Sequence, residues 1–220
     1  MTELPNTAAL ARKGAGRPSA EEAERKHGAL IEAALEEFAA HGFRGASLRT
    51  IAARADISTR TLYNRYPDKI ALFAACLDAS SAQLLQLPDA LPSPSDTPPT
   101  DLAEELGAHI VAVLNYLSRE RSRQIAGLLF REGAEFAEVR ELARAQFERY
   151  QVDPVVEILG RHGLSHPGLR DEAIQFVAMA FGEWQRRLLF GGEPMTLSDM
   201  QRQAALVVRI FLEGISRRQA

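Results

Sequence analysis

Residues 47–66, with the sequence SLRTIAARADISTRTLYNRY, have the spacing of two short helices joined by a tight turn. Leu48, Ile51 and Ala52 occupy positions i, i+3 and i+4, so they share one face of a helix. Ser47 precedes this helix and is a suitable N-cap, because its hydroxyl can accept a hydrogen bond from a free N–H group of the first turn. The pattern predicts a helix-turn-helix, which commits this part of the chain to a small helical domain.

The turn and the second helix complete the pattern. A small residue, a turn residue and an apolar residue stand at Ala52, Asp56 and Leu62, and Ile57 and Leu62 are predicted to close the core between the two helices. Position 56 needs a turn conformation that motifs of this kind usually fill with glycine. Aspartate tolerates left-handed backbone better than most residues, so the departure costs about 1 kcal/mol and leaves the motif intact.

The second helix is rich in side chains that can bind nucleic acid. Ser58 can cap it, and residues 59–65, TRTLYNR, are almost all able to hydrogen-bond to phosphates or base edges. Residues 44–69 contain six basic and two acidic side chains, whereas the whole chain has a net charge of -3. A local positive patch is typical of a phosphate-binding surface. Nucleic-acid binding is therefore favoured; the alternative is a helical hairpin that only packs inside a bundle.

With its flanking segments, the chain from residue 31 to residue 77 resembles the DNA-binding domain of the TetR family (TetR/AcrR-like) of bacterial regulators. The matching segments read IEAALEEFAAHGFRGASL, LRTIAARA, STRTLYNRY and PDKIALFAACL. Asp56, Asn64 and Tyr66 depart from the glycine, histidine and phenylalanine that are common there. The resemblance implies an all-α fold, with an N-terminal three-helix helix-turn-helix DNA-binding domain and a C-terminal helical ligand-binding and dimerisation domain. An AefR-like C-terminal half is one form of the latter.

The resemblance also implies which side chains contact DNA. Those expected to face the major groove are Arg49, Thr59, Arg60, Thr61 and Asn64. Those expected to hold phosphates are Ser47, Tyr63, Arg65 and Lys69, and Ser58 completes the predicted DNA-binding set. Near the N-terminus of its helix, Arg60 has the reach for a bidentate contact to guanine. The alternative for each single arginine is a solvated surface charge.

Composition divides the chain into four parts. Residues 1–20 lack helical periodicity and carry three basic residues among small ones, which predicts a flexible basic arm that either enters the minor groove or has no role. Residues 21–87 would form the DNA-binding domain and a connecting fourth helix. Five of the eleven prolines fall between residues 88 and 100, a segment predicted to be a mobile loop. Residues 101–220 would form the effector-binding and dimerisation domain.

The C-terminal part is helical by its periodicity, with breaks expected at Gly133, residues 163–167 and residues 191–194. Its last two helices, expected at 168–190 and 198–217, are apolar enough to build an intersubunit four-helix bundle; the alternative is burial within one subunit. The residues assigned to this dimer interface are Phe181, Gly182, Trp184, Leu188, Val208 and Phe211. The residues assigned to an effector cavity are Leu128, Phe147, Tyr150, Phe176 and Met179, with core packing as the alternative for each.

Other functional classes find little support. The five histidines are scattered, and glycine and proline interrupt the helix that would align His162 and His166, so neither a metal site nor an enzyme is predicted, and no cofactor. No signal peptide or membrane span is recognisable, which favours the cytoplasm. Cys76, the single cysteine, is predicted to be a packed core thiol, with a redox sensor as the alternative.

The function that this pattern predicts is a ligand-responsive transcriptional regulator. The expected form is a homodimeric repressor that leaves an inverted-repeat operator in double-stranded DNA when a small apolar or amphipathic effector binds. The alternative is a helical interaction protein with a degenerate DNA-binding domain.

Overall fold

The computed structural model describes residues 20–85 and 101–219, and this part of the chain is helical without any strand. Its helices are α1 (Ala20–Gly45), α2 (Leu48–Arg54), α3 (Thr59–Arg65), α4 (Lys69–Leu85), α5 (Leu102–Leu117), α6 (Glu120–Glu135), α7 (Ala137–Phe147), the π-helical turn η1 (Glu148–Val152), α8 (Asp153–Arg161), α9 (Leu169–Phe190) and α10 (Leu197–Gln219). The predicted all-α fold is confirmed. The predicted basic arm and proline-rich loop fall almost wholly on residues 1–19 and 86–100, outside the described residues.

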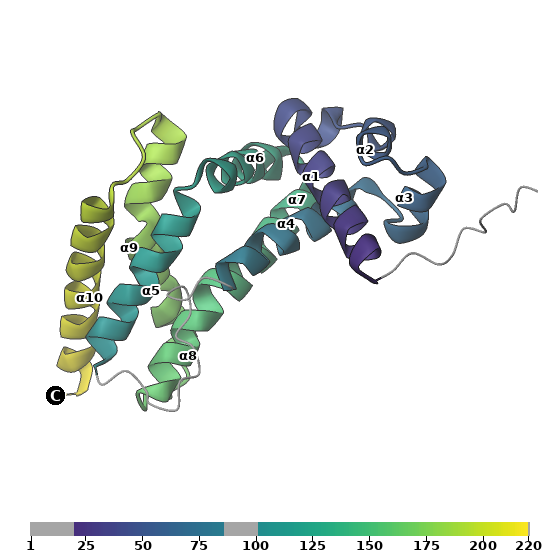
Figure 1. Ribbon diagram of the computed structural model, residues 1–220. Helices are drawn as coiled ribbons and strands as arrows, with labels where there is room; N and C mark the ends of the chain where they lie inside the picture. The colour runs from purple at the N-terminus through teal and green to yellow at the C-terminus, as the bar shows by residue number, and fades with distance from the viewer. Residues whose placement is uncertain (1–19, 86–100, 220) are drawn as a thin grey trace, which may run out of the picture.

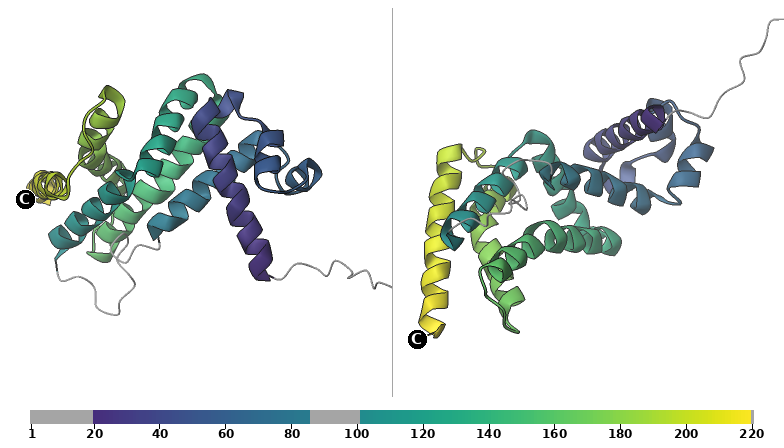
Figure 2. Two further views of the ribbon diagram at one scale, coloured as in Figure 1. Left: turned by 45° about the horizontal axis from the view of Figure 1, so that its top comes forward. Right: turned by 60° about the horizontal axis from the view of Figure 1, so that its bottom comes forward.

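The helices form an elongated arrangement with two ends. Helices α1, α2 and α3 make one end, α9 and α10 make the other, and α4 runs from the first toward the middle (Figure 1). Two further views show the same separation of α3 from α10 (Figure 2). None of the described helices is long and apolar enough to cross a membrane.

The first hydrophobic core forms around one face of α1. The apolar residues of this face recur at helical spacing and are all buried, as their period predicts: Leu30, Ile31, Ala34, Leu35 and Phe38. Phe38 packs edge-on against Phe73 of α4, with 4.9 Å between ring centroids. This core fixes α2, α3 and α4 on α1 and thereby holds the helix-turn-helix rigid.

Gly42 changes the direction of the chain near the end of α1. Its φ of 70° and ψ of 175° lie in a region that is essentially restricted to glycine. The turn brings Phe43 back to the core, where its ring lies 5.4 Å from that of Phe136. Gly42 therefore kinks α1, and the last residues of the helix, up to Gly45, follow this kink.

Helices α6 and α7 join the two ends of the molecule. Leu128 of α6 and Val139 of α7 are buried in the first core, together with residues of α1 and α4. An ion pair of 2.9 Å between Arg44 and Glu135 reinforces this junction. The break expected at Gly133 is wrong, because α6 continues to Glu135; Gly133 instead lies where α6 and α7 approach closely, and a Cβ there would stand 3.7 Å from the backbone of Arg140.

The second core lies among α5, α8, α9 and α10. Phe176 and Phe211 pack there with 4.8 Å between ring centroids, and the indole N–H of Trp184 donates to the carbonyl of Leu117. Four residues of the predicted dimer interface are buried within their own chain, as the alternative of burial within one subunit would have it: Phe181, Trp184, Val208 and Phe211. Their contact with a partner stays a prediction.

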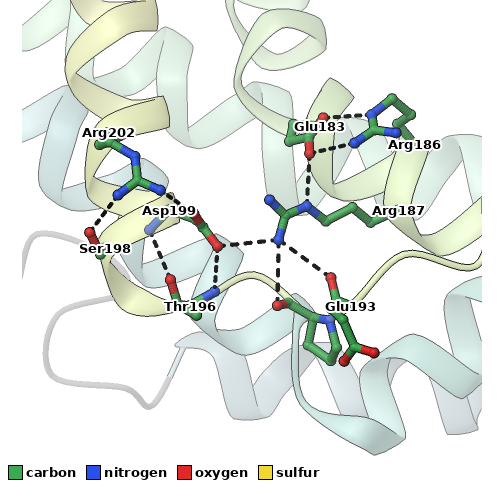
Figure 3. A network of polar contacts seen from close by, with 9 residues as sticks. Glu183, Arg186, Arg187, Glu193, Thr196, Ser198, Asp199 and Arg202 are labelled. Atoms are coloured by element: carbon green, nitrogen blue, oxygen red, sulfur yellow. Dashed lines mark hydrogen bonds and ion pairs between the residues drawn. The ribbon is translucent and has the colours of Figure 1, made fainter.

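A polar network fixes the connection between α9 and α10 (Figure 3). The guanidinium of Arg187 donates to Glu183 at 2.7 Å and to Asp199 at 3.2 Å, and also to the carbonyls of Glu193 and Pro194. Hydrogen bonds from Arg186 and Arg187 lower the pKa of Glu183 to about 2. Asp199 in turn accepts from the backbone N–H of Thr196. These bonds connect the end of α9 and the following loop to the start of α10.

Cys76 is fully buried on α4, and burial raises the pKa of its thiol to about 12. Because the thiolate is the reactive form, we expect the native protein to resist alkylation by iodoacetamide, and to react only as fast as the chain opens. Ellman titration with and without denaturant measures this, and rapid labelling of the native protein would contradict it. The unfolded thiol ionises near 9.0, so its contribution to stability should be lost as the pH rises from there toward 12.

Candidate nucleic-acid interface

Two serine caps and one left-handed residue build the helix-turn-helix. The hydroxyls of Ser47 and Ser58 accept hydrogen bonds from the N–H groups of Thr50 and Thr61, at 3.4 and 3.0 Å. Asp56 has a φ of 52°, so the N–H of Ile57 reaches the carbonyl of Ala52 at 3.0 Å. This arrangement closes the C-terminus of α2 as glycine would.

Helix α3 has one buried apolar side chain, and its other side chains are exposed. Leu62 is completely buried against the first core. The other six side chains of α3 are exposed: Thr59, Arg60, Thr61, Tyr63, Asn64 and Arg65. Arg49 and Thr50 of α2 are exposed as well. Most of the predicted DNA-contacting residues are therefore accessible, as a reading surface for a groove requires, whereas Ser47 and Lys69 are half-buried.

Fewer basic side chains are available on this face than the sequence suggests, because two of them form ion pairs within the chain. Arg54 pairs with Glu36 of α1, and Arg44 pairs with Glu135 of α6. By contrast, the guanidinium groups of Arg49 and Arg60 form no ion pair within the described residues. These two side chains are available to an external anion without first breaking an internal contact.

Lys69 has an additional structural role that the sequence did not reveal. Its ammonium donates to the carbonyls of Phe43 and Arg44, each at 2.9 Å, and lies 5.5 Å from the centre of the Phe43 ring. The first turn of α4 is capped by Asp68, which accepts from the N–H of Ala71. A phosphate contact by Lys69 stays a prediction, for which one of its three N–H groups remains.

Glu37 supports the interface and was missed in the sequence. This carboxylate is buried, and its Oε1 accepts from the backbone N–H of Ser47 at 3.1 Å, just before α2 begins. Arg54 approaches its other oxygen at 3.9 Å and His41 lies 3.5 Å from Oε1. An acidic residue on the apolar side of α1 was the available signal, because a buried carboxylate needs partners.

At the C-terminal end of α3, Arg65 lies near His27 of α1. The pKa of His27 is lowered, first by burial and then by the positive charge of Arg65. His27 is therefore favoured in its neutral form beside the recognition helix.

A cavity of about 240 Å³ lies where α4 meets α5, α6, α7, η1 and α9. Of the predicted effector-binding residues, it brings together Phe147 and Tyr150. Leu128 and Phe176 do not line it; they are buried in the first and second cores respectively, in agreement with the alternative of core packing. Met179 lines a separate groove between α9 and α10.

The π-helical turn that carries Tyr150 into the cavity was also missed. Pro154 follows this turn and has no N–H to donate to the carbonyl of Tyr150, which removes one bond of a regular α-helix. The sequence signal was a proline within an otherwise helical run. Such turns are frequent where a helix bears a functional side chain.

Comparisons with known proteins agree with this geometry. The family model for bacterial regulatory proteins of the tetR family matches residues 30–76. A relative from Streptomyces coelicolor, the HTH-type transcriptional repressor SCO4008, is 25% identical over 182 residues, covering 79% of this chain and 88% of that protein.

Solved structures share the fold over most of the chain. A structure from Mesorhizobium loti MAFF303099, described as a TetR-family transcriptional regulator, has a TM-score of 0.69 and 20% identity, covering 86% of this chain and 96% of that one. The Flavonoid-responsive Regulator FrrA has a TM-score of 0.67 and 24% identity, covering 87% and 97%. The match over the helix-turn-helix, the repressor relative and the shared fold support a DNA-binding transcriptional regulator of the TetR type.

Proposed function

We propose that the protein is a homodimeric repressor that reads an inverted-repeat operator and is released by a small effector. In this proposal residues 21–87 bind DNA, and residues 101–220 dimerise and bind the effector. The observation that carries it is the outer face of α3, where polar side chains surround the single buried anchor Leu62. Repression is favoured because the Streptomyces relative is named a repressor.

Dimerisation is supported by apolar side chains that the single chain leaves uncovered. Leu206 and Ile210 of α10 are 45% and 46% exposed, and Phe190 at the end of α9 is 80% exposed. On α9, the half-buried Gly182 has no atom within 4 Å of the position where a Cβ would lie, so a second helix can approach it closely. Gly182 and the half-buried Leu188 therefore remain candidates for the interface, joined by these exposed residues.

A dimer is also needed to read DNA with useful specificity. One helix-turn-helix reads few base pairs, whereas two copies separated by about 34–36 Å enter successive major grooves. Since α9 and α10 lie at the opposite end of the molecule from α3 (Figure 1), contact through them leaves both recognition helices uncovered.

Replacing Ile210 by glutamate should convert the dimer to a monomer. A charge placed in an apolar interface without a partner is costly, so the dimer dissociation constant should rise about 100-fold or more. Sedimentation equilibrium measures this, with circular dichroism to verify the fold. Ala53→Glu adds the same charge at an exposed position of α2, and it should leave the association of the two chains unchanged. An Ile210→Glu variant that dimerises like the wild type would refute this interface.

The effector part of the proposal is supported by the position of the cavity. Leu77, Ser80 and Ser81 of α4 form part of its wall, and α4 begins directly after the recognition helix. A ligand that binds one position of α4 better than another must change the separation of the two recognition helices. A typical coupling of about 1–3 kcal/mol would lower DNA affinity by about 5- to 150-fold.

Selection from a random pool of double-stranded DNA tests the function directly. The full-length protein should enrich a sequence with inverted repeats whose centres lie about one helical turn apart. A parallel selection with the Ile210→Glu variant should enrich only half-sites, and weakly. Failure of the wild-type protein to enrich any inverted repeat would favour the helical interaction protein with a degenerate DNA-binding domain.

A further inference from the structure

The cavity between α4 and α7 has a wall of unusual composition: none of its lining side chains is charged. Five of them are aromatic, namely Tyr116, Phe130, Phe147, Tyr150 and Trp184. The polar ones are only serine, glutamine and tyrosine side chains. A charged ligand would therefore lose its hydration without gaining a counter-charge, which is costly in an enclosed apolar site.

Two arginines lie against the tyrosine rings of the wall. Arg119 stands 5.6 Å from the ring centre of Tyr116, and Arg149 stands 5.3 Å from that of Tyr150. Neither arginine lines the cavity. A ligand carboxylate in the cavity would thus contact aromatic rings rather than either guanidinium. These arginines therefore do not give the cavity a preference for anionic ligands.

The size and the rings of the wall limit the ligand further. A volume of about 240 Å³ lies just below the roughly 300–1,000 Å³ typical of small-molecule sites, so the ligand should be small. Aromatic side chains pack best against planar rings, through offset stacking or edge-to-face contact. The wall therefore fits a compound of a few linked or fused rings better than a long flexible chain.

One lining side chain connects this wall to α4 by two hydrogen bonds. Gln146 of α7 donates from Nε2 to Asp78 at 2.8 Å, and its Oε1 accepts from the hydroxyl of Ser81 at 2.9 Å. Tyr116 donates to the carbonyl of Ser80 within the same segment. The amide of Gln146 retains a further N–H and a further lone pair, so a ligand can bind it or compete with α4 for it.

We propose that this cavity takes an uncharged aromatic ligand bearing a hydroxyl group, and that Gln146 recognises the hydroxyl and couples it to α4. This inference rests on the proposed function, in which a ligand of the C-terminal half controls DNA binding. The ring system binds the aromatic wall, and the hydroxyl competes with Ser81 and Asp78 for the amide of Gln146.

A series of probes with one ring system tests the ligand class. Isothermal titration of the full-length protein, without DNA, compares 2-naphthol, which is neutral at neutral pH, with 2-naphthoate and with 2-naphthylmethylammonium. The neutral compound should bind at least about 10-fold more tightly than either ion. Equal or tighter binding of an ion, or no binding of 2-naphthol, overturns the assigned class.

Two variants locate the ligand and its hydrogen bond. Ala143→Leu fills the cavity and should abolish 2-naphthol binding; unchanged binding would overturn the location. Gln146→Met keeps the length of the side chain and removes both hydrogen bonds. It should weaken 2-naphthol about 10-fold while leaving unsubstituted naphthalene unaffected. Gln124→Met is the matched control, because that amide binds Glu120 outside the cavity.

Operator binding then tests the coupling. In the wild type, saturating 2-naphthol should weaken binding to the selected operator, and in Gln146→Met the saturated protein should show a markedly smaller change. An identical change in both proteins overturns the coupling role of Gln146. If the proposed function is wrong, the result is different. The protein then selects no operator, but 2-naphthol still binds its cavity.

Discussion

Substituting alanine for Gly42 should lower the free energy of unfolding by about 3 kcal/mol, and Tm by about 6–12 °C. The backbone is the main cause and a side-chain contact is a smaller one. The backbone at φ 70° and ψ 175° is nearly closed to residues with a Cβ, and that Cβ would also stand 2.6 Å from Oε1 of Glu132, the end of a flexible side chain that can move aside. Thermal and urea unfolding followed by circular dichroism measure the loss.

Two companion variants separate these causes. Glu132→Ala in the Gly42→Ala background removes the clash but leaves the backbone strain, so it should restore only part of the stability. Gly160→Ala is the matched control, because no atom lies within 4 Å of its Cβ position in α8, and it should be neutral or slightly stabilising. Wild-type stability of the Gly42→Ala protein would show that the chain does not turn at this residue.

Substituting alanine for Arg60 should weaken binding to the selected operator about 10- to 100-fold at moderate salt. A bidentate contact to a base is worth about 1–3 kcal/mol, and the exposed guanidinium of Arg60 forms no ion pair in the described structure that would have to be given up. Fluorescence anisotropy with labelled operator DNA measures the change. Stability should be unaffected, since the side chain packs against nothing in the core.

The kind of contact can be read from salt and sequence dependence. If Arg60 reads a base, the variant should lose specificity at one position of each half-site while the salt dependence stays nearly constant. If it holds a phosphate instead, affinity should fall for all sequences and the salt slope should decrease by about 1. Arg131→Ala removes the same charge from an exposed position of α6, and this variant should bind the operator as the wild type does. Wild-type affinity of Arg60→Ala would contradict its assignment.

The helix-turn-helix could be predicted because its determinants are local. Ser47 and Ser58 cap the helices that directly follow them, and Asp56 makes the turn between them. The spacing of Ile51, Ala52 and Leu62 is enough to say which side is buried. The polar residues of α3 are exposed as a consequence, so the shape of the candidate DNA surface follows from about twenty consecutive residues.

The C-terminal half could be predicted only as far as its helices. Periodicity shows that α9 and α10 are apolar, but both have apolar residues on more than one side. Which side meets the same chain depends on α5, far away in sequence, so the burial of Trp184 and Phe211 within their own chain could not be predicted. The burial of Leu128 in the first core could not be predicted for a related reason, since α6 packs partly against α1.

Because α4 forms part of the wall of the cavity, ligand specificity and DNA binding depend on shared residues in the proposed function. The two properties therefore cannot evolve separately. A substitution at Ser81 that changes the wall of the cavity also removes the hydrogen bond by which α4 contacts Gln146 of α7, and in the proposed function it thereby changes operator binding. Val113 and Trp184 line the cavity from α5 and α9, so they can vary with less effect on the operator. In the proposed function, a change of ligand specificity is therefore expected first at these two positions.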